Sequence, residues 1–501
     1  MRYRLRAAML LAGLMLVLTA CASQQAQANT PKSTSPGSAA PTLAPTMLPP
    51  TVAPTALPTL PAKLTIAGVD VGGLSVADAR QKLERALASL QQPIELRAGD
   101  QKATLAPADI GLELPLDALL STAEQARAGQ SISLTLTYDQ SKLQAALDKL
   151  GAQLTDPPAV SVITSTKIIS RSFAVSGGYT IDTEAALAAV DTALHDTSRN
   201  RSVNLPLTVS SAARPTPEQL QDQIELIAKQ WKEVAGVMVY DLATGKEIAS
   251  LNKGTVFSAA STIKVAIMLN AYIQLDTIPA KLDAVMKKMI IDSDNIAANA
   301  VLAASAGGSG TEAALKGAEQ MSATLKSLGL GNTYLYVPFE ATDYLAQKKL
   351  KYQLGPVRAG TAPYTDSGRA LRTSPGDMAT IYLYIDQCSR GEGVLIKQFP
   401  KLNAKRCSEM LDRLFANADR SRMRSGLDRS VRVEHKSGWI DDMQADAGIV
   451  RSPGGDFAIA VYLFRTAKPS IPLPDSLFAP YLGAFTRLVY SYYNPVVVAA
   501  P

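Results

Sequence analysis

Histidine is scarce in this 501-residue chain, which contains only His195 and His435. A Ser-His-Asp active site needs a histidine beside its serine to act as the general base. His195 lies in a different predicted domain from the serine motif described below. His435 alternates with Lys436 along a strand-like run, so their side chains point to opposite faces of a sheet. A Ser-His-Asp triad is therefore not expected.

Two further absences limit the chemistry of the chain. No group of cysteine, histidine and acidic residues has the spacing of a zinc site, and the "GGSG" at residues 307–310 is more simply a turn than a phosphate-binding loop. We therefore predict no metal ion and no other cofactor. The formal net charge is only +6 and no dense Lys/Arg cluster stands out, so a nucleic-acid partner is not predicted either.

Residues 1–21 have the pattern of an export signal. Three arginines precede an apolar run over residues 7–18, which is too short to span a bilayer as a mature helix. The "LTAC" that ends at Cys21 resembles a bacterial lipobox, in which the signal is cleaved before the cysteine and the cysteine receives lipid. The resemblance implies an extracytoplasmic lipoprotein anchored to the bacterial membrane. An ordinary signal peptide with an incidental cysteine is the alternative.

The next segment, residues 22–62, consists largely of Pro, Thr, Ser and Ala. Such a composition cannot bury enough apolar surface to fold. It favours the extended polyproline II conformation, whose rise of roughly 3.1 Å per residue gives a reach on the order of 120 Å. We predict a disordered tether that lifts the folded part of the chain off the membrane.

Cysteine is almost as scarce as histidine, because Cys388 and Cys407 are the only cysteines besides Cys21. In an exported protein, an isolated pair of cysteines is a plausible disulfide. Two buried free thiols are the alternative, since the sequence does not establish that the two residues meet.

Residues 63–212 are predicted to form an α+β domain with two related halves. In each half a Gly-Gly turn is followed by a helix, capped by Ser75 in the first half and by Asp182 in the second, and then by a strand. The segments "GVDVGGLSVADA" and "GGYTIDTEAALAAVDTAL" resemble the peptidoglycan-binding-like domain that precedes vancomycin-resistance-W-type proteins. The resemblance implies association with the cell wall, but it assigns no ligand residues. A spacer domain without a ligand is the alternative.

Ser261 and Lys264 stand three positions apart in the largely apolar stretch "AASTIKVAI" at residues 259–267. On a helix over residues 261–275 this spacing places both side chains on one face, one turn apart. Ser261 would lie at the helix N-terminus, where the dipole favours developing negative charge. A serine needs a neighbouring base to become a nucleophile, and burial can make lysine that base by lowering its pKa. The pair therefore predicts nucleophilic catalysis.

Two more short motifs follow, "SDN" at residues 293–295 and "HKSG" at residues 435–438. S-x-x-K, S-D-N and K-S/T-G in this order are the motifs of class A β-lactamases and penicillin-binding proteins. Residues 217–497 resemble this family, also through "LRTSPGDMATIYLYI" and "HKSGWIDDMQADAGIV". The resemblance implies an α/β multidomain chain whose C-terminal domain has an antiparallel sheet flanked by helices and an all-helical subdomain.

The same resemblance implies roles for individual residues. Ser261 would be the acylated nucleophile, and Lys264 would help to deprotonate it. Ser293 would relay a proton to the leaving nitrogen, and Asn295 would contact the substrate or Lys264. Lys436 would attract the carboxylate of the substrate.

The residues after Lys436 would bind the substrate. Ser437 would hydrogen-bond the substrate carboxylate, and Gly438 would let the substrate approach the strand backbone closely. The N–H groups of Trp439 and Ser261 would form an oxyanion hole. Asp294 is expected to be structural.

One part of the family pattern is missing. A class A β-lactamase has a glutamate that activates water shortly before the "TSP" helix start, whereas "LGPVRAGTAPYTDSGRALRTSP" contains none. Glu340 is a distant candidate for this base, and Asp366 is a short one. The long interval between the second and third motifs suggests an inserted loop near residues 305–365.

Three functions remain open from the sequence. The first is a β-lactamase-like hydrolase that opens β-lactams through an acyl-enzyme at Ser261. The second is a D,D-peptidase or penicillin-binding-like enzyme that acts on cell-wall peptides, favoured by the missing glutamate. The third is a non-catalytic lipoprotein that binds peptidoglycan. The expected partners are accordingly a β-lactam or wall-peptide substrate, peptidoglycan, and the membrane through the lipidated N-terminus.

Overall fold

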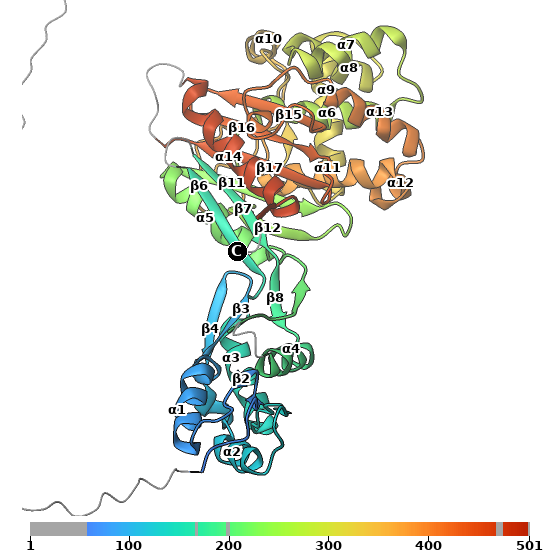
Figure 1. Cartoon of the computed structure of the whole chain (residues 1–501). Coiled ribbons are helices and arrows are strands. Elements are labelled where there is room, and N and C mark those ends of the chain that lie inside the picture. Colours follow the sequence, from blue (N-terminus) through green and yellow to red (C-terminus); the bar gives the residue numbers. More distant parts are fainter. Residues whose placement is uncertain (1–57, 166–168, 197–200, 467–473, 499–501) are drawn as a thin grey trace, which may run out of the picture. The chain divides into compact units, whose positions relative to one another are not determined.

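The computed structural model describes residues 58–165, 169–196, 201–466 and 474–498 (Figure 1). The predicted export signal, Cys21 and nearly all of the predicted tether lie outside the described residues. None of the described helices is long and apolar enough to cross a membrane.

The described chain before residue 159 contains short sheets and three α-helices, which pack around two apolar cores. Its strands are β1 (Thr65–Ile66), β2 (Val69–Asp70), β3 (Ile94–Ala98), β4 (Gln101–Leu105) and β5 (Ser131–Ile132). Its α-helices are α1 (Val76–Leu87), α2 (Leu116–Glu124) and α3 (Gln140–Leu154), and α4 (Thr183–His195) packs into the second core from later in the chain. The later strands are also short: β8 (Gly178–Ile181) pairs with β10 (Leu207–Ser210), and β9 (Ser202–Asn204) pairs with β3.

The two expected helix caps are confirmed. The Ser75 hydroxyl accepts a hydrogen bond from the Asp78 N–H at 3.2 Å and caps α1, and the Asp182 carboxylate accepts one from the Ala185 N–H at 3.1 Å and caps α4. Each cap replaces a bond that the first helical turn cannot make internally. The strands after the two helices, β3 and β9, are parallel neighbours in one sheet, which fits two related halves.

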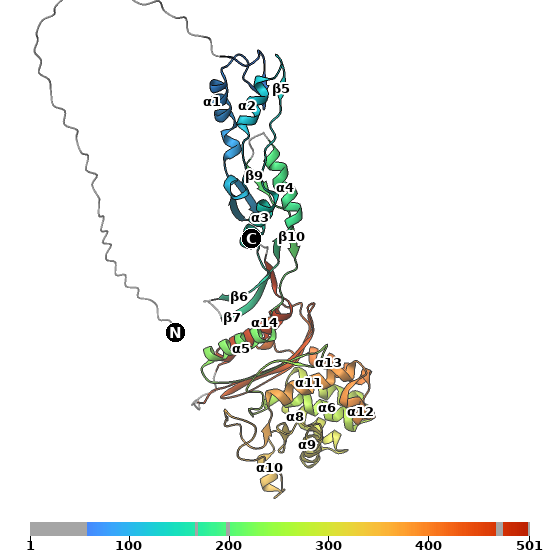
Figure 2. The ribbon, with the colours of Figure 1, turned by 90° about the horizontal axis from the view of Figure 1, so that it is seen from below.

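A five-stranded antiparallel sheet forms the centre of the C-terminal region, in the order β12-β11-β17-β16-β15. The strands are β11 (Val234–Asp241), β12 (Glu247–Leu251), β15 (Val433–Ile440), β16 (Met443–Val450) and β17 (Phe457–Phe464). Figures 1 and 2 show α5 (Pro217–Trp231) and α14 (Asp475–Tyr493) on one face of this sheet and α11 (Pro375–Ser389) on the other. The fold therefore has helices on both faces of an antiparallel sheet.

Both faces of the sheet are apolar because successive strand residues point to opposite sides. In β17, Ile459 and Val461 contact the core formed with α5 and α14, whereas Ala460 and Tyr462 contact the core on the opposite face. All eight residues of β17 are buried. This central strand thus holds the two helical layers together.

A helical group lies beside the sheet and carries the second motif. Its members are α6 (Lys264–Gln274), α7 (Ala280–Ile291), α8 (Asn295–Ser305), α9 (Gly310–Ser327), α10 (Thr342–Gln347), α12 (Gly393–Gln398) and α13 (Ala404–Phe415), with the small strands β13 (Tyr334–Leu335) and β14 (Leu371–Arg372). The interval 305–365, near which an inserted loop was expected, is helical in part, because α9 and α10 lie within it. A disulfide joins Cys388 on α11 to Cys407 on α13.

A hairpin from the predicted first domain packs against the C-terminal region. It consists of β6 (Ala159–Ser165) and β7 (Ser170–Ser176), and β7 pairs in parallel with β18 (Val496–Val498). Phe173 is fully buried in the core of α5 and α14, and its N–H donates to the Ser491 hydroxyl at 2.9 Å. The hairpin therefore belongs to the C-terminal region by its packing.

Candidate active site

Ser261 lies in a 3₁₀ turn, η3 (Ala260–Ile263), that leads directly into α6. The next residue, Thr262, is buried, and its hydroxyl bonds the Tyr462 hydroxyl at 2.8 Å and the Ala259 carbonyl at 2.6 Å. Ala260 has a positive φ of 43°, a conformation that costs energy for a residue with a side chain. The bond to Tyr462 of β17 thus fixes the chain directly after the partly exposed Ser261.

Lys264 is the centre of the hydrogen-bonded group. Its Nζ lies 2.8 Å from the Ser261 Oγ, 2.7 Å from the Asn295 Oδ1 and 3.2 Å from the Ser293 Oγ. It also lies 2.6 Å from the Ser293 carbonyl oxygen. The structure therefore brings together four polar side chains from the first two motifs.

The pKa of Lys264 is lowered to about 7. Burial is the largest cause, because the fully buried side chain loses the hydration of its charge, and the positive charge of Lys436 adds to the effect. Asp294 and Glu340 act in the opposite direction. Near neutral pH, a large fraction of Lys264 is a neutral amine, which can accept a proton from Ser261.

The second motif is held by a strained turn and a helix cap. Ser293 has a positive φ of 59°, and Asp294 caps α8 by accepting a hydrogen bond from the Ala297 N–H at 2.6 Å. Asp294 is therefore structural, as expected, while the residues on either side of it point to Lys264.

The third motif lies on β15, beside the serine turn. Lys436 is buried, and burial lowers its pKa to about 8, although the charges of Asp446 and Asp419 oppose this shift. A Cβ atom added to Gly438 would lie 2.7 Å from the backbone nitrogen of Ser261. Glycine at this position is therefore required by the close approach of β15 to the serine turn, in addition to the substrate approach expected from the sequence.

Sequence analysis missed two residues next to Ser437 and Trp439. Burial would raise the pKa of Asp419, but a hydrogen bond from the Ser437 hydroxyl and the charge of Arg422 outweigh it and hold the pKa below its usual range. The Arg422 guanidinium pairs with Asp419 at 2.6 Å and lies 4.6 Å from the centre of the half-exposed Trp439 ring. In the sequence, the only indication of these two residues is that they belong to the polar loop just before the third motif.

Glu340 is not distant from the site, which corrects the sequence-based expectation. Its Oε1 accepts a hydrogen bond from the Asn295 Nδ2 at 3.0 Å, and the ring of its neighbour Phe339 lies 4.8 Å from the Lys264 Nζ. Asn299 on α8 holds this segment through two hydrogen bonds to the Phe339 backbone, of 2.8 and 2.9 Å. The contact could not be found from the spacing along the chain.

The described residues at this site form neither a Ser-His-Asp triad nor a metal site. His435 is buried and pairs with Asp446 at 2.9 Å, whereas the Ser261 hydroxyl is hydrogen-bonded to Lys264. Within the part of the chain that the structure describes, no cluster of His, Cys, Asp and Glu could hold a metal ion. The arrangement fits a serine nucleophile with a lysine base.

Comparisons with known proteins agree with this arrangement. Residues 219–284 and 280–492 match the family described as the beta-lactamase enzyme family, and this span is more than half of the chain. No curated protein matches the chain.

Three solved structures illustrate the likeness. PBP-A is 22% identical over 56% of this chain and 98% of its own, with a TM-score of 0.41. A representative of class A beta-lactamase from Bacteroides cellulosilyticus is 18% identical over 56% of this chain and 99% of its own, with a TM-score of 0.42. An ancestral class A beta-lactamase is 21% identical over 54% of this chain and 98% of its own, with a TM-score of 0.39.

The contact between β15 and the serine turn predicts the effect of Gly438→Ala. The new methyl group would overlap the Ser261 backbone, so we expect the free energy of unfolding to fall by about 1–3 kcal/mol. Urea denaturation measures this change. The control is Gly151→Ala in α3, where no atom lies within 4 Å of the new Cβ, and stability should be unchanged or rise by up to about 1 kcal/mol. Equal stability of both variants and the parent chain would contradict the contact.

Proposed function

The chain belongs to the beta-lactamase enzyme family, and we propose that it is a serine hydrolase that opens β-lactam amides through an acyl-enzyme at Ser261. The observation that carries the proposal is the 2.8 Å distance between the Lys264 Nζ and the Ser261 Oγ, combined with the lowered pKa of that lysine. A serine beside an amine that is about half neutral at pH 7 is activated at that pH.

In the proposed acylation step, Lys264 accepts the proton of the Ser261 hydroxyl while the oxygen attacks the amide carbonyl carbon. The N–H groups of Ser261 and Trp439 stabilise the resulting oxyanion. The carbon–nitrogen bond then breaks, and the Ser293 hydroxyl, 3.2 Å from the Lys264 Nζ, passes the proton to the leaving nitrogen. The charge of Lys436 attracts the substrate carboxylate.

In the proposed deacylation step, Glu340 is the general base that activates water. Its hydrogen bond to Asn295 at 3.0 Å supports this role, because Asn295 also contacts Lys264. Its positive φ of 57° supports the role as well, since strained backbone is concentrated at functional sites. Water attacks the ester carbon while Glu340 takes a proton from it; the bond between that carbon and the Ser261 oxygen then breaks, the proton is passed on to the Ser261 oxygen, and the product leaves as an acid.

A second candidate function is a slow D,D-peptidase that acts on cell-wall peptides. The exposed position of Glu340 favours it, and so does its hydrogen bond, which comes from Asn295 and not from the Ser261 hydroxyl. The third possibility, a non-catalytic binding protein, is disfavoured by the intact group around Lys264.

We also infer the cellular setting from the sequence. Cleavage before Cys21 and lipidation of that cysteine would anchor the chain outside the cytoplasmic membrane, with residues 22–62 as the tether. Residues 63–212 would bind peptidoglycan and hold the hydrolase near its substrate. Metabolic labelling with a radioactive fatty acid tests the anchor, since Cys21→Ala should remove the label.

Labelling with fluorescent penicillin tests the proposed function. We expect covalent label on the parent chain and none on Ser261→Ala, because only the Ser261 oxygen can form the ester. After excess penicillin is removed, rapid loss of label supports β-lactam hydrolysis, and persistent label supports the peptidase. A parent chain that is folded and takes no label would contradict both catalytic functions.

Replacing Glu340 by Gln tests the proposed deacylation base. Loss of general-base help should slow release of the acyl group by about 10²- to 10⁴-fold, while acylation changes little. The decay of the fluorescent label measures the release. Asp366→Asn is the matched control, since Asp366 is the other candidate from the sequence. Slow decay in the Asp366 variant instead of the Glu340 variant would move the role to Asp366.

The two lowered lysine pKa values predict the pH dependence of acylation. The rate should rise as Lys264 loses its proton around pH 7 and fall as Lys436 loses its charge around pH 8. Lys436→Gln removes the positive charge that lowers the pKa of Lys264, so the rising limb should move to higher pH. Stopped-flow acylation rates between about pH 5 and 10 measure both limbs. An unmoved rising limb in Lys436→Gln would show that another group titrates.

A further inference from the structure

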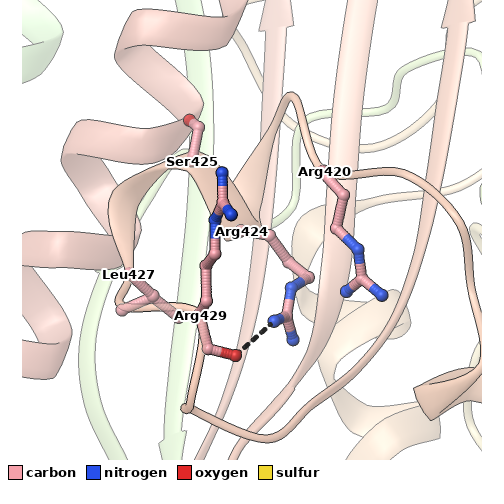
Figure 3. A pocket seen from close by; sticks show the side chains of 5 residues that line it. All are labelled: Arg420, Arg424, Ser425, Leu427 and Arg429. Carbon is pink, nitrogen blue, oxygen red and sulfur yellow. Dashed lines mark hydrogen bonds between the residues drawn. The ribbon is translucent and has the colours of Figure 1, made fainter.

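A cavity of about 590 Å³ lies outside the group around Ser261 and is lined by arginine. Figure 3 shows the lining residues, which are Arg420, Arg424, Ser425, Leu427 and Arg429. They belong to the loop and short 3₁₀ turn, η4 (Met423–Gly426), between α13 and β15. The volume is within the range of ordinary small-molecule sites, about 300–1,000 Å³.

The positive charge in this cavity is not neutralised. Among the described residues, no carboxylate lies within ion-pair distance of Arg420, Arg424 or Arg429. Arg422 in the same loop is the opposite case, because it turns inward and pairs with Asp419 and Asp475 at 2.6 and 2.9 Å. Arg422 therefore points into the protein, whereas Arg420 and Arg424 on either side of it in the sequence line the cavity.

Arg424 is held in place by uncharged acceptors. Its two Nη atoms donate to the carbonyl oxygens of Val431 at 3.1 Å and Arg429 at 3.2 Å, and Figure 3 marks the second bond. Carbonyl oxygens fix the guanidinium without cancelling its charge. Burial lowers the pKa of Arg424, and the charge of Arg420 lowers it further, so the two guanidinium groups repel each other across the cavity.

The acidic residue of the surrounding loop is already engaged. The Oδ1 of Asp428 accepts hydrogen bonds from the Ser430 N–H at 2.9 Å and the Ser430 hydroxyl at 2.7 Å, and its carboxylate offsets part of the charge of Arg429 without forming an ion pair with it. On α14, Arg487 adds another positive charge and donates to the Ser425 carbonyl at 3.4 Å. A ligand with more than one negative charge would relieve this repulsion.

The cluster also corrects the sequence analysis. That analysis found no dense Lys/Arg cluster, yet five arginines stand at positions 420, 422, 424, 429 and 432. Arg422 and Arg432 are paired with acids, so three remain for an external anion.

We propose that this arginine cavity is a binding site for a phosphate group, carried by a ligand larger than inorganic phosphate. Guanidinium forks match phosphate oxygens in pairs, and a phosphate monoester carries about −1.5 to −2 charge at neutral pH. The Ser425 side of the cavity supplies a polar wall and Leu427 an apolar one. The site accepts a lipid headgroup or a soluble phosphate ester by the same chemistry.

The test uses the full chain and three probes. Isothermal titration calorimetry measures binding of inorganic phosphate and of glycerol 3-phosphate, and sedimentation compares phosphatidylcholine vesicles with and without phosphatidic acid, whose headgroup is a phosphate monoester. The variant Arg420→Glu/Arg429→Glu changes two exposed residues and should fold. We expect it to weaken binding about tenfold or more, since hydrogen bonds to charged groups are strong.

Two further variants test whether binding depends on the net charge of the chain and on the guanidinium group of Arg424. Arg85→Glu/Arg127→Glu changes the net charge equally at exposed positions outside the cavity and should leave binding unchanged. Arg424→Lys keeps the charge but loses the fork and should also weaken binding. Cavity-dependent binding of glycerol 3-phosphate identifies a soluble ester, and cavity-dependent binding of only phosphatidic acid vesicles identifies a lipid headgroup. No saturable binding, or equal binding by the cavity and control variants, would overturn the proposal.

Discussion

The hydrogen bond between the Lys264 Nζ and the Ser261 Oγ is the contact on which the rest of the active site depends. Its chemical value comes from the position of Lys264 at the start of α6, a helix whose residues from Lys264 to Ile273 are all buried. An amine without water around it loses the hydration that favours its charged form. The surrounding structure must therefore supply acceptors for the amine while keeping water away.

The two layers of the C-terminal region meet this requirement together. The helical group provides Ser293 and Asn295 as acceptors at the start of α8, and β15 provides the distant positive charge of Lys436. Close contact is possible because Gly438 has no side chain to keep β15 away from the serine turn. The geometry of the site therefore depends on one contact, in which β15 lies within van der Waals distance of the turn that leads into α6.

The sequence was sufficient where a residue's environment is local. Ser75 and Asp182 cap helices that begin beside them, and Ser261 and Lys264 are three positions apart where the turn η3 leads into α6. It was insufficient where the chain returns from far away. Glu340 reaches Asn295 only because Asn299 holds the Phe339 backbone.

The same limit applies to the loop and hairpin contacts. Asp419 approaches Ser437 through a loop whose path is set by tertiary contacts, and no short motif encodes that path. The hairpin of β6 and β7 packs on α14 through Phe173, which contacts residues more than 300 positions later in the chain. Packing partners at such separations leave no periodic signal in a single sequence.

The central claim is that the Lys264 amine loses its proton near neutral pH, and a direct titration of the amine tests it. NMR of lysine labelled with ¹³C at Cε, assigned by comparison with Lys264→Arg, follows the protonation of this one side chain. The account predicts a midpoint at about pH 7. A midpoint near the ordinary lysine value of 10.5 would contradict it, because Ser261 would then have no base beside it.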